Sequence, residues 1–161
     1  VRPENPRQNI NLSVGSFDGD RSGHLHVGYN QTLLIGTGRL PVDVSLYHGS
    51  ETTLQGELRV AGVTVMVEGT LKNVENLTVV DGGTLKVNEM MDLSYTRIDR
   101  ILFKTINIRN RGSLHMDNGE AQHILDGRSL HVYPGGLLKA KNLLVTAENV
   151  TIDVMGAVEA D

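Results

Sequence analysis

The stretch ENLTVVDGGTLKV, residues 75–87, reads as two short β-strands around a tight glycine turn. Apolar and polar residues alternate on both sides of the turn, and a period of two is typical of strands that bury one face. Nearly the same pattern returns as RSLHVYPGGLLKA at 128–140 and as ENVTIDVMGAVEA at 148–160. One small unit used several times predicts a repeat architecture, in which equivalent positions stack on one another.

Alignment on the glycine defines a repeat unit that is apolar at its second, fourth and tenth positions and has Gly at its eighth. Its copies are GVTVMVEGTLKN at 62–73, NLTVVDGGTLKV at 76–87, TINIRNRGSLHM at 105–116, SLHVYPGGLLKA at 129–140 and NVTIDVMGAVEA at 149–160. The second half of the unit, Gly-x-(Leu/Val), starts at Gly23, Gly38, Gly56, Gly69, Gly83, Gly112, Gly136 and Gly156. We interpret this glycine as the residue that supplies the positive φ of a tight corner.

Two all-β architectures fit this pattern: a single-domain parallel β-helix (β-solenoid) and a β-sandwich or jelly roll. The glycine spacings predict coils of irregular length, about 20–30 residues each, and this irregularity favours the solenoid. The predicted coils run from Gly56 to Gly83, from Gly83 to Gly112, from Gly112 to Gly136 and from Gly136 to Gly156. We expect residues 1–22 to form a polar N-terminal arm or cap and residues 23–161 to form the solenoid. No long helix is predicted, and residues 90–103 are interpreted as a loop plus an extra strand.

The apolar positions predict two ladders of aliphatic side chains in the interior of the solenoid. Stacked aliphatics bury most of their surface, and each stabilises the fold by roughly 1.5–3 kcal/mol. The first predicted ladder is Leu25, Leu40, Leu58, Leu71, Leu85, Leu114, Leu138 and Val158. The second is Val65, Val79, Ile108, Val132 and Ile152.

Composition excludes several functional classes. With 161 residues, 39% hydrophobic and 21% charged, the chain has the composition of a globular domain. A net charge of −4, six Phe and Tyr and no Trp argue against a nucleic-acid partner. No apolar run approaches the roughly 18 residues needed for a membrane span, so we expect no membrane insertion. The absence of cysteine excludes disulfides and thiolate metal sites.

Four sequons, at Asn11, Asn30, Asn76 and Asn149, predict N-linked glycans and an extracellular, secreted protein. Coincidence in a Thr-rich β-protein is the other interpretation. The chain begins at Val1 rather than at methionine, which fits a processed product.

A basic column is predicted on the outer face of the strands. The residue that follows each ladder position is His26, Pro41, Arg59, Lys72, Lys86, His115, Lys139 or Glu159. Stacked like charges repel one another, so a column of them suggests a site for a polyanion such as an acidic glycan. We take Arg59, Lys72, Lys86, His115 and Lys139 as candidates for that site. Ordinary solvation is the alternative, because two units per coil would divide the column between two faces.

Metal and catalytic signals are weak. Asp18, Asp20, Asp117 and Glu120 lie in turn-rich loops and could offer carboxylates to Ca²⁺, but their spacing does not match a calcium loop. His24 and His26 share one strand face without a third metal ligand. Enzymes with this fold, such as pectate lyases, build an outer cleft from long loops, whereas these loops are short. With no nucleophile elbow, phosphate loop or zinc motif, we expect neither catalysis nor a cofactor other than Ca²⁺.

The repeats NLTVVDGGTLKV and SLHVYPGGLLKA, with sequons in the turns and no cysteine, resemble extracellular β-helix regions of large adhesion molecules. Over about residues 23–160 the chain is similar to the ring-forming core protein of sponge aggregation factors, and bacterial adhesin passengers and vertebrate β-helical ectodomains have similar modules. The resemblance implies a glycosylated subunit of a proteoglycan-like ring that supports calcium-dependent cell–cell adhesion.

The leading hypothesis is therefore a structural extracellular glycoprotein that self-assembles, and the alternative is a β-helix that binds or cleaves polysaccharide. The last unit ends at VMGAVEAD, which places Val154 and Val158 on the terminal coil. Further chain or another subunit should cover that end. We expect head-to-tail association with a second copy, which closes into a ring or grows into a filament.

Overall fold

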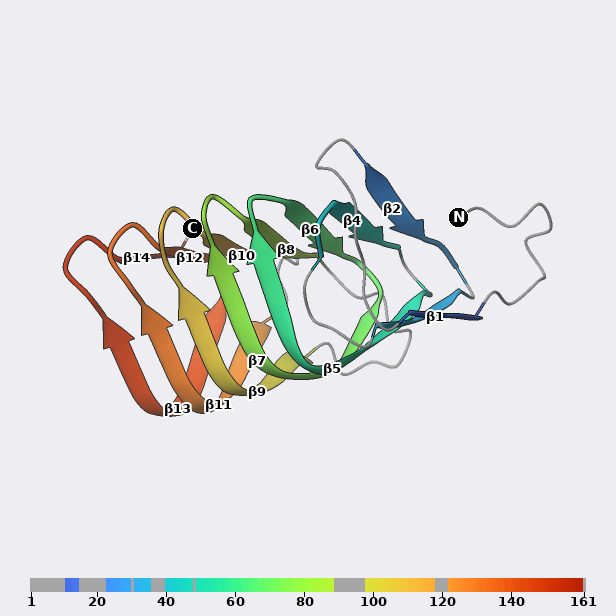
Figure 1. Cartoon of the computed structure of the whole chain (residues 1–161). Coiled ribbons are helices and arrows are strands. Elements are labelled where there is room, and N and C mark those ends of the chain that lie inside the picture. The colour runs from blue at the N-terminus through green and yellow to red at the C-terminus, as the bar shows by residue number, and fades with distance from the viewer. Residues whose placement is uncertain are drawn as a thin grey trace.

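The computed structural model describes residues 11–14, 23–29, 31–35, 40–47, 49–88, 98–117 and 122–160, which form fourteen β-strands and no helix. Two seven-stranded sheets divide these strands by their order in the chain (Figure 1). Sheet A contains β1 (Asn11–Val14), β3 (Thr32–Ile35), β5 (Glu51–Ala61), β7 (Thr70–Val80), β9 (Ile98–Ile108), β11 (Gln122–Val132) and β13 (Leu143–Ile152). Sheet B contains β2 (His24–Val27), β4 (Asp43–Leu46), β6 (Thr64–Val67), β8 (Thr84–Asn88), β10 (Ser113–Asp117), β12 (Leu137–Ala140) and β14 (Ala157–Ala160).

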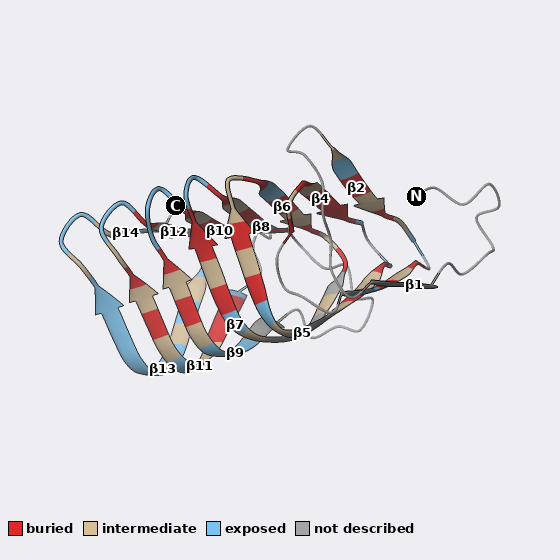
Figure 2. Ribbon diagram, viewed as in Figure 1, coloured by how far each residue is buried: buried red, intermediate tan, exposed pale blue. Residues whose placement is uncertain are grey.

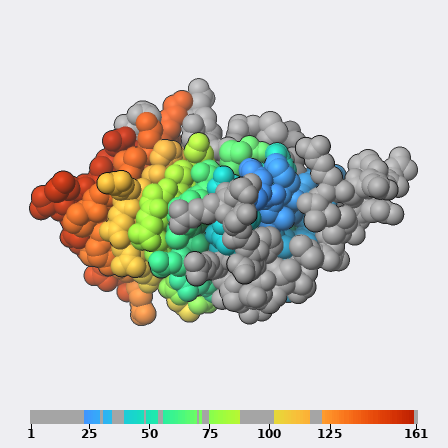
Figure 3. Space-filling model, turned by 45° about the horizontal axis from the view of Figure 1, so that its top comes forward, coloured from blue at the N-terminus to red at the C-terminus, as the bar shows by residue number. Residues whose placement is uncertain are grey.

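The chain winds as a parallel β-solenoid. It passes from a strand of sheet A to a short strand of sheet B and back, and the sheet A strands from β5 onward are long and bent (Figure 1). Every described strand pairing is parallel. Successive coils therefore lie side by side along the long axis, which Figure 3 shows as colour bands in sequence order. The expected β-solenoid is confirmed. The alternative of a β-sandwich or jelly roll, whose sheets are antiparallel, is wrong.

The register between strands shows where each coil begins and ends. Thr84 pairs with Ser113, Ser113 with Leu137, and Leu137 with Ala157. Each of these residues directly follows a repeated glycine, so the three coils predicted between Gly83 and Gly156 are confirmed.

The coil predicted from Gly56 to Gly83 is wrong. Thr84, the residue after Gly83, pairs with Thr64 on sheet B. Glu57, the residue after Gly56, pairs instead with Asn76 on sheet A. The error arises because Gly56 lies at a register shift inside β5 rather than at a corner between the sheets.

The strands differ from the sequence prediction in two segments of the chain. The extra strand expected within residues 90–103 is the beginning of β9, a regular long strand of its coil, and residues 89–97 lie outside the described residues. Residues 11–14, which the sequence assigns to the polar arm, form β1 and extend sheet A beside β3. The rest of segment 1–22 lies outside the described residues.

The interior is filled by aliphatic ladders that run along the axis. From sheet B, Leu25, Val44, Val65, Leu85, Leu114, Leu138 and Val158 stack in register. Sheet A contributes one ladder of Leu58, Leu77, Ile106, Leu130 and Val150 and another of Val60, Val79, Ile108, Val132 and Ile152. Except in the last coil, these side chains are buried (Figure 2).

The inward faces are predicted correctly, but the composition of the two predicted ladders is wrong. Leu58 and Leu71 face the interior from sheet A, Val65 belongs to sheet B, and Leu40 is buried outside any strand. The reason is local: Gly-x-(Leu/Val) occurs in both sheets, so an alignment of the units superimposes strands that lie on different walls of the solenoid.

The repeated glycine has a different role from the one predicted. At Gly83, Gly112 and Gly136 φ is not positive, and a β-carbon would lie 2.4, 2.2 and 2.3 Å from a backbone carbonyl oxygen of the neighbouring coil. The residue just before supplies the positive φ, as Gly82 does at 75° and Gly135 at 74°. Arg111 takes that conformation before Gly112, and Met155 takes it at a fourth corner, before Gly156. The expectation that the repeated glycine supplies the turn conformation is therefore wrong for these corners.

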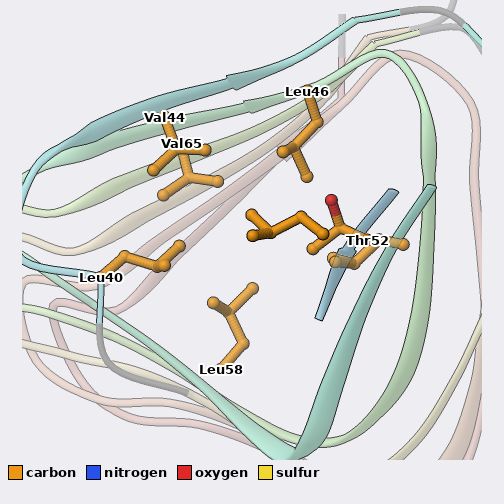
Figure 4. A pocket seen from close by; sticks show the side chains of 8 residues that line it. Leu40, Val44, Leu46, Thr52, Leu58 and Val65 are labelled. Carbon is orange, nitrogen blue, oxygen red and sulfur yellow. The ribbon is translucent and has the colours of Figure 1, made fainter. Parts of the chain in front are cut away.

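A small cavity lies inside the N-terminal coils (Figure 4). It measures about 10 Å³, and its lining is aliphatic apart from Thr52. The Thr52 side chain is buried, and its hydroxyl makes no hydrogen bond. A trapped water needs two to four polar partners, and this lining offers one, so the hydroxyl sits in an apolar environment. An unsatisfied buried hydroxyl costs about 1–3 kcal/mol.

We therefore expect Thr52→Val to stabilise the domain by about 1 kcal/mol, because valine keeps the branched shape and removes the hydroxyl. Thr53→Val is the matched control, since Thr53 is the partly exposed next residue on the same strand and should give a much smaller change. Urea denaturation of the three proteins measures the difference. A stability of Thr52→Val equal to or below that of the wild type would contradict an unsatisfied hydroxyl at this position.

Candidate functional site

A row of side chains in register follows the outer face of sheet B, and one of its members, Ser45, is buried. Parallel in-register pairing places these seven residues in one line, which we call the sheet B track: His26, Ser45, Met66, Lys86, His115, Lys139 and Glu159. Neighbouring members belong to adjacent strands, about 4.8 Å apart. Lys86 and Lys139 therefore lie about 9–10 Å apart, on either side of His115.

Only part of the predicted basic column lies in this track. Lys86, His115 and Lys139 are consecutive in it. Arg59 pairs with Thr78 on sheet A, and Lys72 pairs with Thr53, also on sheet A. The five residues thus divide between two walls, because the repeat unit occurs in both sheets. We call Lys86, His115 and Lys139 the basic column.

The electrostatics of the basic column depend on His115. Partial burial, followed by the positive charges of Lys86 and Lys139, lowers the pKa of His115 below its ordinary value, and Glu159 acts weakly in the opposite direction. At neutral pH the column therefore has two ammonium groups separated by a neutral imidazole. An added negative charge would relieve the repulsion and favour protonation of the ring.

Two basic residues of sheet A are matched by carboxylates. Lys104 Nζ lies 2.6 Å from Glu75 Oε2, and Arg128 Nε lies 3.4 Å from Glu148 Oε2. All four side chains are well exposed, so these pairs add little stability, but they cancel charge locally. The sheet B track contains one carboxylate, Glu159, at its end. Within the track, Lys86 and Lys139 lie on either side of His115, and Glu159 is the neighbour of Lys139 on the next strand.

An aromatic cluster occupies the N-terminal end of the same track. The rings of His24 and His26 stack with centroids 4.1 Å apart, and Tyr47 stacks on His26 at 5.7 Å. Hydrogen bonds hold the histidines in place: His24 Nε2 lies 2.9 Å from Ser45 Oγ, and His26 Nδ1 lies 3.1 Å from the Tyr47 hydroxyl. Sequence reasoning missed Tyr47, which is distant from His26 in the chain. The pairing of β2 with β4 would have revealed it.

The sequons at Asn76 and Asn149 stand at equivalent positions, as the repeat predicts, but inside the long strands β7 and β13 rather than in turns. Asn76 pairs with Thr105, Thr105 with Ser129, and Ser129 with Asn149, so both asparagines stand in one row on sheet A. Both side chains are exposed. Asn30 and the side chain of Asn11 lie outside the described residues. Exposure makes Asn76 and Asn149 accessible positions, and their glycosylation stays a prediction.

The predicted calcium ligands fall largely outside the structure. Asp18, Asp20 and Glu120 are outside the described residues, and of Asp117 only the backbone at the end of β10 is described. In the part of the chain that is described, no three His, Asp or Glu side chains converge on a point where a metal ion would bind. Calcium binding stays a prediction.

The C-terminal coil exposes the apolar ladders. Its inward positions Val150 and Ile152 are each 51% exposed, whereas Leu130 and Val132, their neighbours in β11, are 1% and 0% exposed. At the last corner Val154 and Met155 are also exposed. Figure 2 shows the contrast between β13 and the strands behind it. The structure thus ends in an uncovered apolar face bordered by the free edges of β13 and β14.

None of the described segments contains a helix that is long and apolar enough to span a membrane. No protein-family model matches the chain, and comparisons with curated proteins and with solved structures give no match either.

Proposed function

We propose that this chain is a structural module of a secreted, glycosylated adhesion assembly, which associates head to tail through its C-terminal coil. The observation that carries the proposal is the exposure of Val150 and Ile152 at positions that are buried in the preceding coil. Burying a valine or isoleucine contributes roughly 1.5–3 kcal/mol, so covering this face is favourable. The function requires shape and surface chemistry, and no catalytic step.

Further coils of the same protein would bury that face, and where no further coil follows, a second copy of the chain is the proposed occupant. Both sheets are parallel throughout the described strands, so each end of the solenoid presents edges of the same polarity. The free edges of β13 and β14 can therefore continue onto β1 and β2 of another copy without reversing a strand. Such a heterologous contact produces a ring if the rotation closes and a filament if it does not. Calcium dependence of the adhesion belongs to the same proposal.

We expect the purified chain to associate reversibly with increasing concentration in sedimentation velocity. The double variant Val150→Lys/Ile152→Lys should stay monomeric, because two charges would then stand on the apolar face. Thr151→Lys is the matched control: it lies between these residues on β13 and points outward. It should associate like the wild type. A wild-type chain that is monomeric at its solubility limit, or equal loss of association in the control, would refute stacking through this face.

Glycosylation is tested separately. In protein from its natural source, mass mapping after deglycosylation should show glycans at Asn76 and Asn149, whose side chains are exposed in one row. Substitution of each asparagine by glutamine should leave the thermal stability within about 0.5 kcal/mol, as for other surface positions. Unmodified asparagine at both positions would remove the main support for a secreted glycoprotein and would leave the assembly proposal without its extracellular setting.

A further inference from the structure

The sheet B track combines two features that no part of the assembly proposal uses. Its C-terminal half is the basic column, with ammonium groups on alternate strands, and its N-terminal half carries the stacked rings of His26 and Tyr47. The strand register aligns both halves in one row, in which Met66 and the buried Ser45 separate Lys86 from His26. The row lies on a side of the solenoid, so it stays available when copies stack end to end.

The distance between neighbouring side chains of the sheet B track determines what kind of ligand can contact several of them at once. Its members recur about every 4.8 Å along the solenoid axis, so a complementary ligand must be extended and repetitive. A polysaccharide chain has sugar units of similar length, and its negative charges recur on every second unit when acidic and neutral sugars alternate. Charges at that interval would meet Lys86 and Lys139 together, since these lie about 9–10 Å apart.

The aromatic end favours a sugar over other polyanions. The face of an aromatic ring carries negative charge, and it attracts the slightly positive C–H groups on the apolar face of a sugar ring. Tyr47 is 39% exposed and Tyr29, which lies against Gly49 nearby, is 63% exposed. A nucleic acid is disfavoured by the net charge of −4, which repels a dense polyanion from the rest of the surface.

We propose that the sheet B track binds an extended acidic polysaccharide parallel to the solenoid axis, with its anionic groups on Lys86 and Lys139 and a sugar ring against His26 and Tyr47. Either carboxylate or sulfate groups supply the charge that the lysines recognise. This site is independent of the association through the C-terminal coil.

The binding test uses immobilised polygalacturonate as the carboxylated probe, dextran sulfate as the sulfated probe and neutral dextran as the blank. We expect the wild type to bind at least one charged probe and not the blank, with affinity that falls as salt is added. Lys86→Gln/Lys139→Gln should weaken binding by about tenfold or more. Arg59→Gln/Arg109→Gln, which removes the same charge from β5 and from the corner after β9, should change affinity less than about twofold.

Two further measurements separate this site from general charge. Tyr47→Ala should weaken binding to the charged probe without changing its salt dependence, because no charge is removed. Mild acidification from neutral pH should strengthen binding as His115 gains its proton between Lys86 and Lys139, with Glu159 the nearest carboxylate in the row. His115→Gln should abolish that increase. All variants should sediment like the wild type, which shows that they fold and assemble normally.

Three outcomes would overturn the proposal. Absence of binding to both charged probes is the first. Equal weakening by the two double variants is the second, because net charge alone would then explain binding. The third is an RNA homopolymer that binds the track more tightly than either polysaccharide. Failure of self-association would leave the site unaffected, so the two proposals fail separately.

Discussion

Replacement of Leu114 by aspartate is expected to unfold the domain. Leu114 is fully buried, and it stacks between Leu85 and Leu138 in the ladder of sheet B. An ionised carboxylate there would have no partner and no water, which costs several kcal/mol. Typical domains are stable by only about 5–15 kcal/mol. Because Leu114 lies in a middle coil, its loss removes support from the coils on both sides.

The control for this prediction is Lys86→Asp, which introduces the same carboxylate one residue beyond Leu85. Lys86 is exposed on the outer face, so the variant should melt within a few degrees of the wild type. Leu85→Asp should behave like Leu114→Asp, since Leu85 is 2% exposed. Thermal melts followed by circular dichroism distinguish the outcomes. A folded Leu114→Asp variant would mean that the assigned inward face is wrong.

The fold was predictable because its main signals are local. Alternation of period two identifies the inward face of each strand, and recurrence of the unit identifies stacked coils, so Leu85 and Leu114 were placed correctly. Membership of a sheet was not predictable in the same way. Leu58 and Leu85 occur in nearly identical units but lie on different walls, and only the strand register separates them.

The candidate site was predictable only in part for the same reason. The repeat alignment groups Lys86, His115 and Lys139 correctly, because the glycines before them occupy equivalent corners in the structure. It places Arg59 wrongly, because Gly56 lies inside a strand of sheet A and not at such a corner. The contact between Tyr47 and His26 depends on short N-terminal coils outside the repeat alignment. The sequence places Val154 and Val158 on the terminal coil, and both are exposed. It does not predict the exposure of Ile152, which it assigns to an inward ladder, because the lack of a neighbouring coil exposes even inward positions of an end coil.

The two adjacent glycines of the opening stretch are expected to lose different amounts of stability on substitution. In Gly83→Ala the new β-carbon would lie 2.4 Å from the Val60 carbonyl oxygen. That oxygen is backbone of the neighbouring coil, so relief requires the coils to separate, and we expect a loss of about 1–3 kcal/mol. Gly82 has φ of +75° and nothing within 4 Å of a β-carbon. Asparagine tolerates this conformation, so Gly82→Asn should cost less than about 1 kcal/mol.

Urea denaturation of both variants decides whether close approach or turn conformation accounts for the repeated glycine. Gly112→Ala repeats the test at another corner, where the β-carbon would lie 2.2 Å from the Val79 carbonyl oxygen. There the positive φ belongs to Asn110 and Arg111, so no glycine is needed for the turn itself. If close approach is the reason, Gly83→Ala and Gly112→Ala lose similar stability. A larger loss in Gly82→Asn than in Gly83→Ala would restore the turn conformation as the reason that this chain repeats its glycine.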